Sequence, residues 1–302
     1  MTSFLNEIVH ADCIEALTQL PDRSVDLVII DPPYWKIANE RWDYEWRTKN
    51  DYVDWCVQWL DEVARVIKLS GSVYIFGYTR NLIYLYQAFA ERNFLFRQEI
   101  IIDKGKRALG GRHTSRYKQF PNVTETIWFF VHNAKPFIKD FLKDRQKTMG
   151  LKNHEINQRL GVKTNGGGVW SLYTGNNILA QVPTEEMWGR LAEVLEFDLP
   201  YSEIGQVFNI EMGHTNVWRD IDFWSEKRHH PTQKPVHLIE RLVTASSSPG
   251  MTVLDPFAGS GSTALACLNL DRNYIGIEKD EKYVELAQKR IAEHAPQETL
   301  PL

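Results

Sequence analysis

The sequence predicts an α/β fold in which a mostly parallel sheet is covered by helices on both faces. Short β-branched runs alternate with amphipathic stretches at both ends of the chain, which is typical of such a sheet. The last third of the chain has the pattern of a strand-helix-strand-helix unit, and such units need parallel strands with right-handed crossovers. The 302 residues suffice for one large α/β domain, so both ends are expected to share one sheet.

Elements of the first 134 residues follow from the spacing of apolar side chains. Apolar residues between 52 and 67 recur every three or four positions, which predicts a helix with one buried face that is ended by Gly71. Two shorter helices are expected at 13–20 and 81–91. Runs rich in β-branched and aromatic residues predict strands at 7–10, 25–30, 72–76, 94–102 and 124–131.

The alternation stops in the middle of the chain, so residues 135–222 are expected to be an insert between a first part, 1–134, and a last part, 223–302. Residues 153–160 and Gly161 resemble the helix and turn of a helix-turn-helix, although a helical hairpin fits equally. The regular pattern returns after the insert. It predicts helices at 236–245, 262–270 and 281–292 and strands at 252–255 and 274–278.

Composition excludes several classes of protein. With 43% hydrophobic and 25% charged residues, the chain is too apolar to be disordered. No run approaches the roughly 20 apolar residues of a membrane-spanning helix, and the first residues lack the regions of a signal peptide. The three cysteines, Cys13, Cys56 and Cys267, are too far apart for metal spacing. We therefore expect a cytoplasmic protein with no metal and no membrane contact.

Charge is distributed unevenly along the chain. Residues 97–163 contain 15 Lys and Arg against 6 Asp and Glu, so this segment has a net charge of +9 while the whole chain has −4. A basic segment in an acidic body is typical of a protein that binds a polyanion on one face. Taken alone, these counts fit a solvated charged surface better than a polyanion-binding face, so the choice between the two depends on the motifs below.

A glycine-containing motif runs from Asp255 to Thr263, where a strand ends and a helix begins. Its two glycines allow a tight turn and close approach of a ligand, and the helix start offers unpaired N–H groups. Glu278 ends the next strand, where a carboxylate can bind both hydroxyls of a ribose. The alternative is a tight turn without a ligand. The combination favours a nucleoside cofactor, although the motif is neither a phosphate loop nor a full dinucleotide fingerprint.

A second motif, Asp31-Pro32-Pro33-Tyr34, follows the most hydrophobic strand. The prolines fix the backbone and remove competing donors, so a carboxylate, a carbonyl and an aromatic ring share the carboxyl edge of the sheet. Two acceptors and a stacking ring suit an exocyclic amino group, whose nitrogen keeps its lone pair for attack. The alternative is a proline pair that only ends the strand, with Tyr34 packed beneath it.

A third motif lies at residues 230–235, His-Pro-Thr-Gln-Lys-Pro, directly before a predicted helix. Lys234 or nearby N–H groups could bind a carboxylate of the cofactor; the alternative is a loop stiffened by proline. His229 and His230 have no third ligand at metal spacing, so we expect a loop surface there.

The sequence resembles the beta-class DNA amino-methyltransferases, in which the catalytic motif precedes the cofactor motif. The resemblance rests on four segments in this order: Asp31 to Tyr34, the basic middle, residues 230–235 and Phe257-Ala-Gly-Ser-Gly261. The resemblance covers residues 7–134 and 223–292. It implies a Rossmann-like class I methyltransferase fold with a seven-stranded sheet, and it makes the insert the target-recognition region. It also implies double-stranded DNA as substrate and a homodimer, which is common in this family.

The resemblance implies S-adenosyl-L-methionine as methyl donor, with Glu278 at its ribose and Asp12 near its adenine. The residues expected at the cofactor are Asp12, Cys13, Asp31, Lys234, Asp255, Phe257, Ala258, Gly259, Ser260, Gly261, Ser262, Thr263, Glu278 and Lys279. The catalytic residues are Asp31, Pro32, Pro33 and Tyr34. Asp at the first position of this motif resembles adenine-N6 members of the family. Asp103 departs from the family pattern, which affects details of the base pocket.

The reaction expected is methyl transfer to N6 of an adenine that is flipped out of the duplex, because a stacked base is out of reach. DNA phosphates are expected to contact basic side chains after a strand: Lys104, Lys106, Arg107, Arg112, Arg116 and Lys118. Trp35, Trp42 and Trp46 either close over the base or form a packed aromatic cluster. Three alternatives remain: a cytosine-N4 enzyme, a methyltransferase for RNA or a protein glutamine, and a catalytically inactive DNA-binding module.

Overall fold

The computed structural model describes residues 4–35, 45–109, 118–163, 168–176, 180–209, 213–226 and 233–294. Contacts divide the chain into two units. Unit 1 contains residues 1–67, 71–131 and 207–302, and unit 2 contains residues 68–70 and 132–206. In the part of the chain that the structure describes, no helix is long and apolar enough to cross a membrane.

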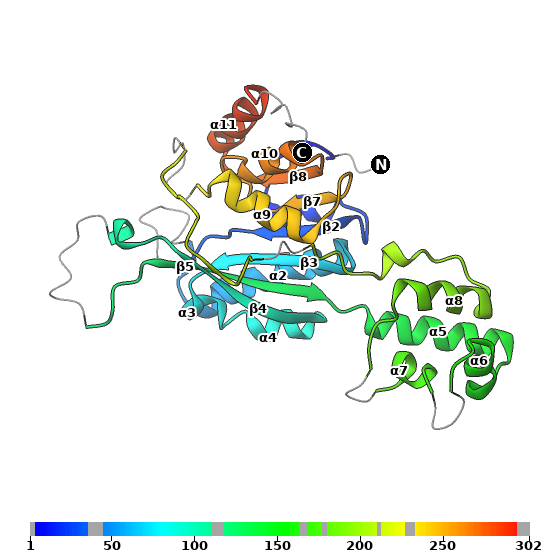
Figure 1. The fold of residues 1–302 in the computed structure, drawn as a ribbon. Helices are drawn as coiled ribbons and strands as arrows, with labels where there is room; N and C mark the ends of the chain where they lie inside the picture. Colours follow the sequence, from blue (N-terminus) through cyan, green and yellow to red (C-terminus); the bar gives the residue numbers. More distant parts are fainter. Residues whose placement is uncertain are drawn as a thin grey trace. The chain divides into compact units, whose positions relative to one another are not determined.

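Unit 1 is built on an eight-stranded sheet. The pairs β1 with β8, β8 with β7, β7 with β2, β2 with β3 and β4 with β6 are parallel, whereas β3 and β5 are antiparallel. Its strands, in spatial order, are β1 (Glu7–His10), β8 (Asn273–Glu278), β7 (Thr252–Asp255), β2 (Val25–Ile30), β3 (Ile67–Gly77), β5 (Thr124–His132), β4 (Phe94–Asp103) and β6 (Val217–Trp218). The predicted mostly parallel sheet, with strands from both ends of the chain, is confirmed (Figure 1).

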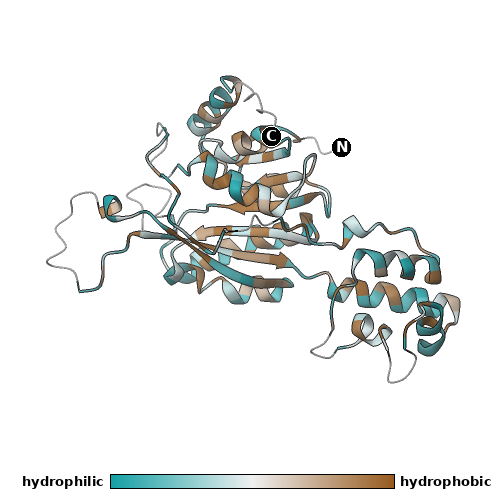
Figure 2. Ribbon diagram, in the orientation of Figure 1, coloured by the Kyte–Doolittle hydropathy of each residue, from teal (hydrophilic) through white to brown (hydrophobic). Residues whose placement is uncertain are grey.

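Helices cover both faces of this sheet (Figure 1). One group is α1 (Cys13–Leu17), α2 (Lys49–Val66), α3 (Thr79–Leu82) and α4 (Tyr86–Glu91); the other is α9 (Val236–Ser246), α10 (Ser262–Asn269) and α11 (Glu281–Ala292). Side chains of β2 alternate between them, because successive residues of a strand point to opposite faces. Val28 and Ile30 pack in the core under the first group, whereas Leu27 and Ile29 pack under the second. In Figure 2 the central strands of the sheet are mostly brown, whereas the helices mix brown with teal.

Three details differ from the sequence-based expectation. The sheet has an eighth strand, because the two-residue β6 pairs with Ile101 and Ile102. A strand of two residues is too short to show an alternation of hydrophobic and polar residues, so the sequence did not predict it. Gly71 does not end a helix: α2 ends at Val66, and β3 begins at the next residue and includes Gly71. The predicted helix 81–91 is two helices, α3 and α4, with a break between Leu82 and Tyr86.

Unit 2 is helical and has a hydrophobic core of its own, which includes Ile138, Leu142, Trp170 and Trp188. Its elements are α5 (Lys135–Met149), α6 (Asn153–Arg159), α7 (Trp170–Thr174), α8 (Glu185–Leu195) and the 3-10 turn η5 (Tyr201–Glu203). Gly150 ends α5 in the left-handed conformation at φ 63°, which favours glycine, and α6 starts three residues later.

The expected insert, 135–222, is longer than unit 2, which ends at residue 206. Trp218 and Ile221 lie in the core of unit 1, and Trp218 belongs to β6 of the sheet. The segment after residue 207 therefore belongs to the sheet unit, although its sequence lacks sheet periodicity.

Candidate active site

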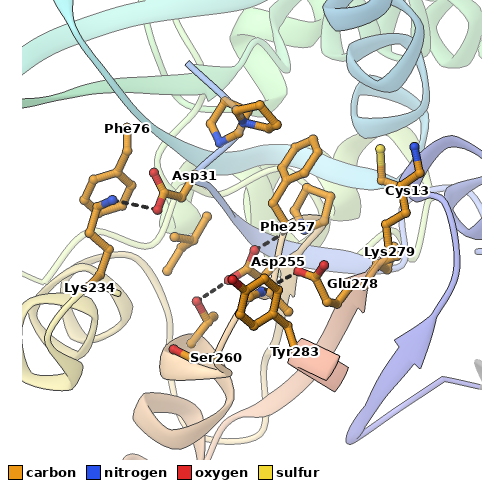
Figure 3. Close-up of a pocket in the computed structure, with 18 of the residues that line it drawn as sticks. Cys13, Asp31, Phe76, Lys234, Asp255, Phe257, Ser260, Glu278, Lys279 and Tyr283 are labelled. Carbon is orange, nitrogen blue, oxygen red and sulfur yellow. Dashed lines mark hydrogen bonds and ion pairs between the residues drawn. The ribbon is translucent and has the colours of Figure 1, made fainter. Parts of the chain in front are cut away.

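The predicted functional residues converge at one edge of the sheet of unit 1. Asp31 follows β2, Asp255 is the last residue of β7 and Glu278 is the last residue of β8. Because these strands are parallel, their carboxyl ends meet at this edge. β5 is antiparallel to β3, so its start, with Glu125, reaches the same edge. A cavity of about 830 Å³ lies there, and Figure 3 shows carboxylates from the three parallel strands around it.

The turn from β7 to α10 is fixed by Asp255 and by Gly261. One oxygen of Asp255 accepts the backbone N–H of Phe257 at 3.0 Å, and the other accepts the hydroxyl of Thr263 at 2.5 Å. Gly261 has φ 78°, and an added Cβ would lie 2.9 Å from Cβ of Ala287 in α11. Only glycine therefore lets α11 pack this close to the turn.

Glu278 ties this turn to the next strand. Its Oε2 accepts the N–H of Gly259 at 2.8 Å, and its Oε1 accepts the N–H of Asp280 at 2.9 Å. A carboxylate has about four lone-pair sites, so both oxygens can still accept hydroxyl groups of a ligand. The side chain lines the cavity, and burial raises its pKa.

Asp255 gives the cavity a preference for positive charge. Burial is the main reason why its pKa rises to about 7, and the nearby charges of Asp31 and Glu278 add to the rise. A cation placed in the cavity would stabilise the ionised carboxylate. The walls therefore suit a ligand that combines hydroxyl groups with a positive charge.

The motif that begins at Asp31 is held by contacts from two helices and their flanks. The Tyr52 hydroxyl donates to the Pro33 carbonyl at 2.9 Å, and the Asn81 amide donates to the Tyr34 carbonyl. The Tyr34 hydroxyl donates to Oδ1 of Asp31. The Tyr34 ring meets the Tyr78 ring edge-on at 5.8 Å; it lines the cavity and also packs against the core under the second group of helices.

Lys234 links Asp31 to a second buried carboxylate. Its Nζ lies 2.6 Å from Oδ2 of Asp31 and 3.0 Å from Oε1 of Glu125, and Lys104 Nζ lies 3.1 Å from the other Glu125 oxygen. Burial opposes the charge on Lys234 and Glu125. The opposite charges outweigh it, so the Glu125 pKa is lowered to about 2 and the Lys234 pKa is raised.

Aromatic side chains form another wall of the cavity. Trp46, Trp55 and Phe257 line it, with ring centroids 4.5 Å apart for the tryptophan pair and 5.7 Å for Trp55 and Phe257. Trp35 stacks on the Tyr52 ring at 6.2 Å. Of the two expectations for the tryptophans, Trp35 fits the packed cluster, whereas Trp46 packs on Trp55 and also lines the cavity. Trp42 lies outside the described residues.

Comparison with known proteins agrees with this arrangement. A family model described as DNA methylase matches residues 25–289. The chain belongs to the DNA methylase family. It is 29% identical to the Type II methyltransferase M.HinfI of Haemophilus influenzae, over 98% of this chain and 71% of that protein. It is 27% identical to the DNA adenine methyltransferase YhdJ of Escherichia coli, over 99% and 88% of the two chains. The crystal structure of the M1.HpyAVI-SAM complex matches with TM-score 0.58 and 22% identity, over 94% and 98%.

In this DNA methylase most predicted cofactor residues line one cavity. They are Asp12, Cys13, Asp31, Lys234, Asp255, Phe257, Ala258, Gly259, Ser260, Ser262, Thr263, Glu278 and Lys279. Gly261 instead packs behind the turn, against Ala287. Lys234 has partners that the sequence did not suggest: its ammonium pairs with Asp31 and Glu125, because burial makes a carboxylate partner necessary. A contact of this side chain with a cofactor carboxylate would compete with both pairs.

The predicted DNA-contact residues of the methylase divide into two groups. Lys106, Arg107 and Lys118 are exposed, and the Arg107 guanidinium lies 4.8 Å from the centre of the Trp224 ring. Lys104 instead faces the cavity and pairs with Glu125. The other two predicted DNA contacts, Arg112 and Arg116, lie outside the described part of the chain, so the structure does not test them. The same holds for His229 and His230, which were predicted to form a loop surface.

Sequence reasoning missed Glu125 of the methylase. This residue is 7% exposed, lines the cavity and neutralises two lysines. The sequence does contain a signal, because Glu125 is the one charged residue inside the apolar run from Thr124 to Val131. A carboxylate in a strand that is otherwise buried needs a partner or a function.

Proposed function

We propose that this protein transfers a methyl group from S-adenosyl-L-methionine to N6 of an adenine in double-stranded DNA. The observation that carries the proposal is the Asp31 carboxylate, held beside the Tyr34 ring in the same cavity as the glycine turn and Glu278. The relative that is named as a DNA adenine methyltransferase supports adenine as the target base. The solved SAM complex of a protein with the same fold supports the methyl donor.

The cavity residues fit S-adenosylmethionine. Glu278 would accept the ribose hydroxyls, Asp12 and the Phe257 ring would border the adenine, and Asp255 would face the positive charge. When bound, the cofactor supplies an electrophilic methyl group on a cationic sulfur. Asp12 is preorganised for this role, because its Oδ1 accepts the Ile14 N–H at 2.9 Å at the start of α1.

Asp31 prepares the nucleophile. Its Oδ1 accepts the Tyr34 hydroxyl and its Oδ2 accepts Lys234, and each oxygen keeps a lone pair for a hydrogen of the substrate amine. Such a hydrogen bond, with the Pro32 carbonyl as second acceptor, localises the nitrogen lone pair and strengthens as positive charge develops on nitrogen. The orientation it gives also removes much of the entropic barrier.

Base reading is proposed for unit 2. Residues 135–163 contain eight Lys and Arg against three Asp and Glu, a balance that favours DNA. On α6, Ile156 and Asn157 are buried, while His154, Gln158 and Arg159 are exposed. These three side chains can hydrogen-bond base edges in a major groove. The homodimer stays a prediction.

The exposed basic residues predict a salt-dependent DNA affinity. Replacing Lys118 by alanine removes one phosphate contact, so the slope of log Kd against log salt should fall by about 1. Fluorescence anisotropy with a labelled duplex at several salt concentrations measures this slope. Lys289→Ala is the matched control, because that lysine lies on α11 and pairs only weakly with Glu293 at 3.9 Å. An unchanged slope for Lys118→Ala would place the DNA elsewhere.

The raised pKa of Asp255 predicts pH-dependent cofactor binding. A cationic ligand favours the ionised carboxylate, so binding releases a proton and affinity should fall as pH drops below about 7. Calorimetry between pH 5.5 and 8.5 should show this for S-adenosylmethionine and a weaker trend for the neutral S-adenosylhomocysteine. Equal pH dependence of the two ligands would contradict the role of Asp255.

Mass spectrometry of nucleosides tests the function itself. Unmethylated duplex DNA is incubated with the protein and S-adenosylmethionine, then digested, and N6-methyladenine is expected. N4-methylcytosine would keep the fold and the donor but overturn the base assignment. Methylation of RNA or of a protein in place of DNA would establish another substrate. Cofactor and DNA binding without any methylated product would indicate an inactive binding module.

A further inference from the structure

We propose that Lys234 and Glu125 are positioning residues that hold Asp31 ionised and aimed at the substrate amine. This inference rests on the proposed methyl transfer, because it assigns a role to side chains that touch Asp31 and not the substrate. The four groups Asp31, Lys234, Glu125 and Lys104 form a row of alternating charge, in which each member lies within 3.1 Å of the next.

The contacts of Lys234 fix its direction. Its Nζ has three hydrogens, and three acceptors surround it: Oδ2 of Asp31 at 2.6 Å, Oε1 of Glu125 at 3.0 Å and the Tyr34 hydroxyl oxygen at 3.3 Å. Its backbone is also held, because the Ser262 hydroxyl at the start of α10 donates to the Lys234 carbonyl at 2.8 Å. The ammonium therefore engages Oδ2 and leaves the Oδ1 side of Asp31 to Tyr34 and the substrate.

Stability does not explain this row of charges. Lys234 and Glu125 are each 7% exposed, and buried ion pairs are often no more stable than apolar side chains of similar volume. Two carboxylates are balanced by two ammoniums. The two ends of the row, Asp31 and Lys104, keep 22% and 21% of their side chains exposed, whereas Lys234 and Glu125 between them are buried. Because the charges of the row cancel, the Asp31 carboxylate can stay charged in a closed cavity. Asp31 needs this once the substrate base has displaced water from the cavity.

Each partner has a separate effect on Asp31. Lys234 stabilises the anionic form but also withdraws electron density from it. Glu125 also accepts a hydrogen bond from the Lys234 ammonium, so this ammonium neutralises Asp31 only in part. Oδ1 of Asp31 therefore remains a strong acceptor. Other titratable groups that face the row are Tyr34, Tyr78 and Asp255, and none of them carries positive charge. In the described part of the chain, Lys234 is thus the one cation within hydrogen-bond distance of Asp31.

The decisive variant is Lys234→Met, which keeps the length of the side chain without its charge. We expect at least a 100-fold lower rate of a single methyl transfer at neutral pH, with affinities for S-adenosylmethionine and DNA within threefold of the unaltered protein. Removal of the cation leaves Asp31 and Glu125 as neighbouring carboxylates that share a proton. The acid limb of the pH–rate profile should therefore move towards higher pH, so that alkaline buffer restores part of the rate.

Conservative and paired variants separate positioning from packing. Lys234→Arg keeps the charge and should recover the rate to within tenfold. Glu125→Gln should lower the rate about tenfold without changing affinity. The double variant Lys234→Met with Glu125→Gln should be no slower than Lys234→Met, because the uncompensated carboxylate is gone. Lys289→Met is the control for loss of a lysine outside the cavity.

The assay counts tritiated methyl groups on any base, so the inference is tested even if the product is N4-methylcytosine. Absence of transfer by the unaltered protein would overturn the proposed function and this inference with it. A Lys234→Met rate within threefold of normal, or an unmoved pH profile, would overturn the inference alone. A loss confined to S-adenosylmethionine affinity would also overturn it and would assign Lys234 to the cofactor.

Discussion

Replacing Asp31 by alanine or asparagine should lower methyl transfer by about 10³-fold while S-adenosylmethionine affinity stays within a few-fold of normal. The reason is that Asp31 bonds Tyr34 and Lys234 beside the base site, whereas the ligands expected at the ribose are Glu278 and the glycine turn. Loss of one preorganised group that acts on developing charge costs about 10²–10³ in rate. Single-turnover transfer of a radiolabelled methyl group, with calorimetry of the cofactor, measures both quantities.

Asp54→Asn is the matched control for this experiment, because Asp54 is an exposed carboxylate on α2, outside the cavity. It should leave rate and affinity unchanged. Equal loss of transfer and cofactor affinity in Asp31→Asn would show that Asp31 acts through cofactor binding. The assigned role would then be wrong even though the variant is inactive.

Replacing Gly261 by alanine should remove most cofactor affinity and lower the melting temperature. The new Cβ would lie 2.9 Å from Cβ of Ala287, and φ of 78° is unfavourable for alanine. Overpacking of this kind costs about 1–3 kcal/mol, and the left-handed backbone adds about 1 kcal/mol. Relief of the clash requires the turn and α11 to move apart, and we expect this to displace Gly259 and its bond to Glu278.

Gly250→Ala is the control for the cost of placing alanine in a left-handed backbone conformation without a packing clash. Gly250 has φ 81°, but an added Cβ there would meet no atom within 4 Å. It should lower the melting temperature slightly and leave cofactor affinity intact. Differential scanning fluorimetry with and without S-adenosylmethionine compares the two variants. If Gly261→Ala behaves like Gly250→Ala, packing of α11 does not shape the cofactor site.

Local sequence determined the strands and the motifs that follow them. β1, β2, β4, β5, β7 and β8 lie close to their predicted positions, because each contains a short run of β-branched or aromatic residues. Asp31, Asp255 and Glu278 could be assigned to one edge, since the carboxyl ends of parallel strands meet there. The convergence of catalytic and cofactor motifs therefore followed from strand order and direction, without any knowledge of side-chain contacts.

The tertiary structure alone decided the partners of the buried charges and the limits of the helical unit. Lys234 and Glu125 are 109 positions apart in the sequence, and only the antiparallel direction of β5 brings Glu125 to the catalytic edge. Residues from 207 onwards join the sheet unit through Trp218 and Ile221, which stand in a mostly polar stretch without the alternation of a strand. The spacing of hydrophobic residues along the sequence indicates local secondary structure. Which charged side chains form pairs, and which strands lie side by side, depends instead on contacts between segments that are distant in the sequence.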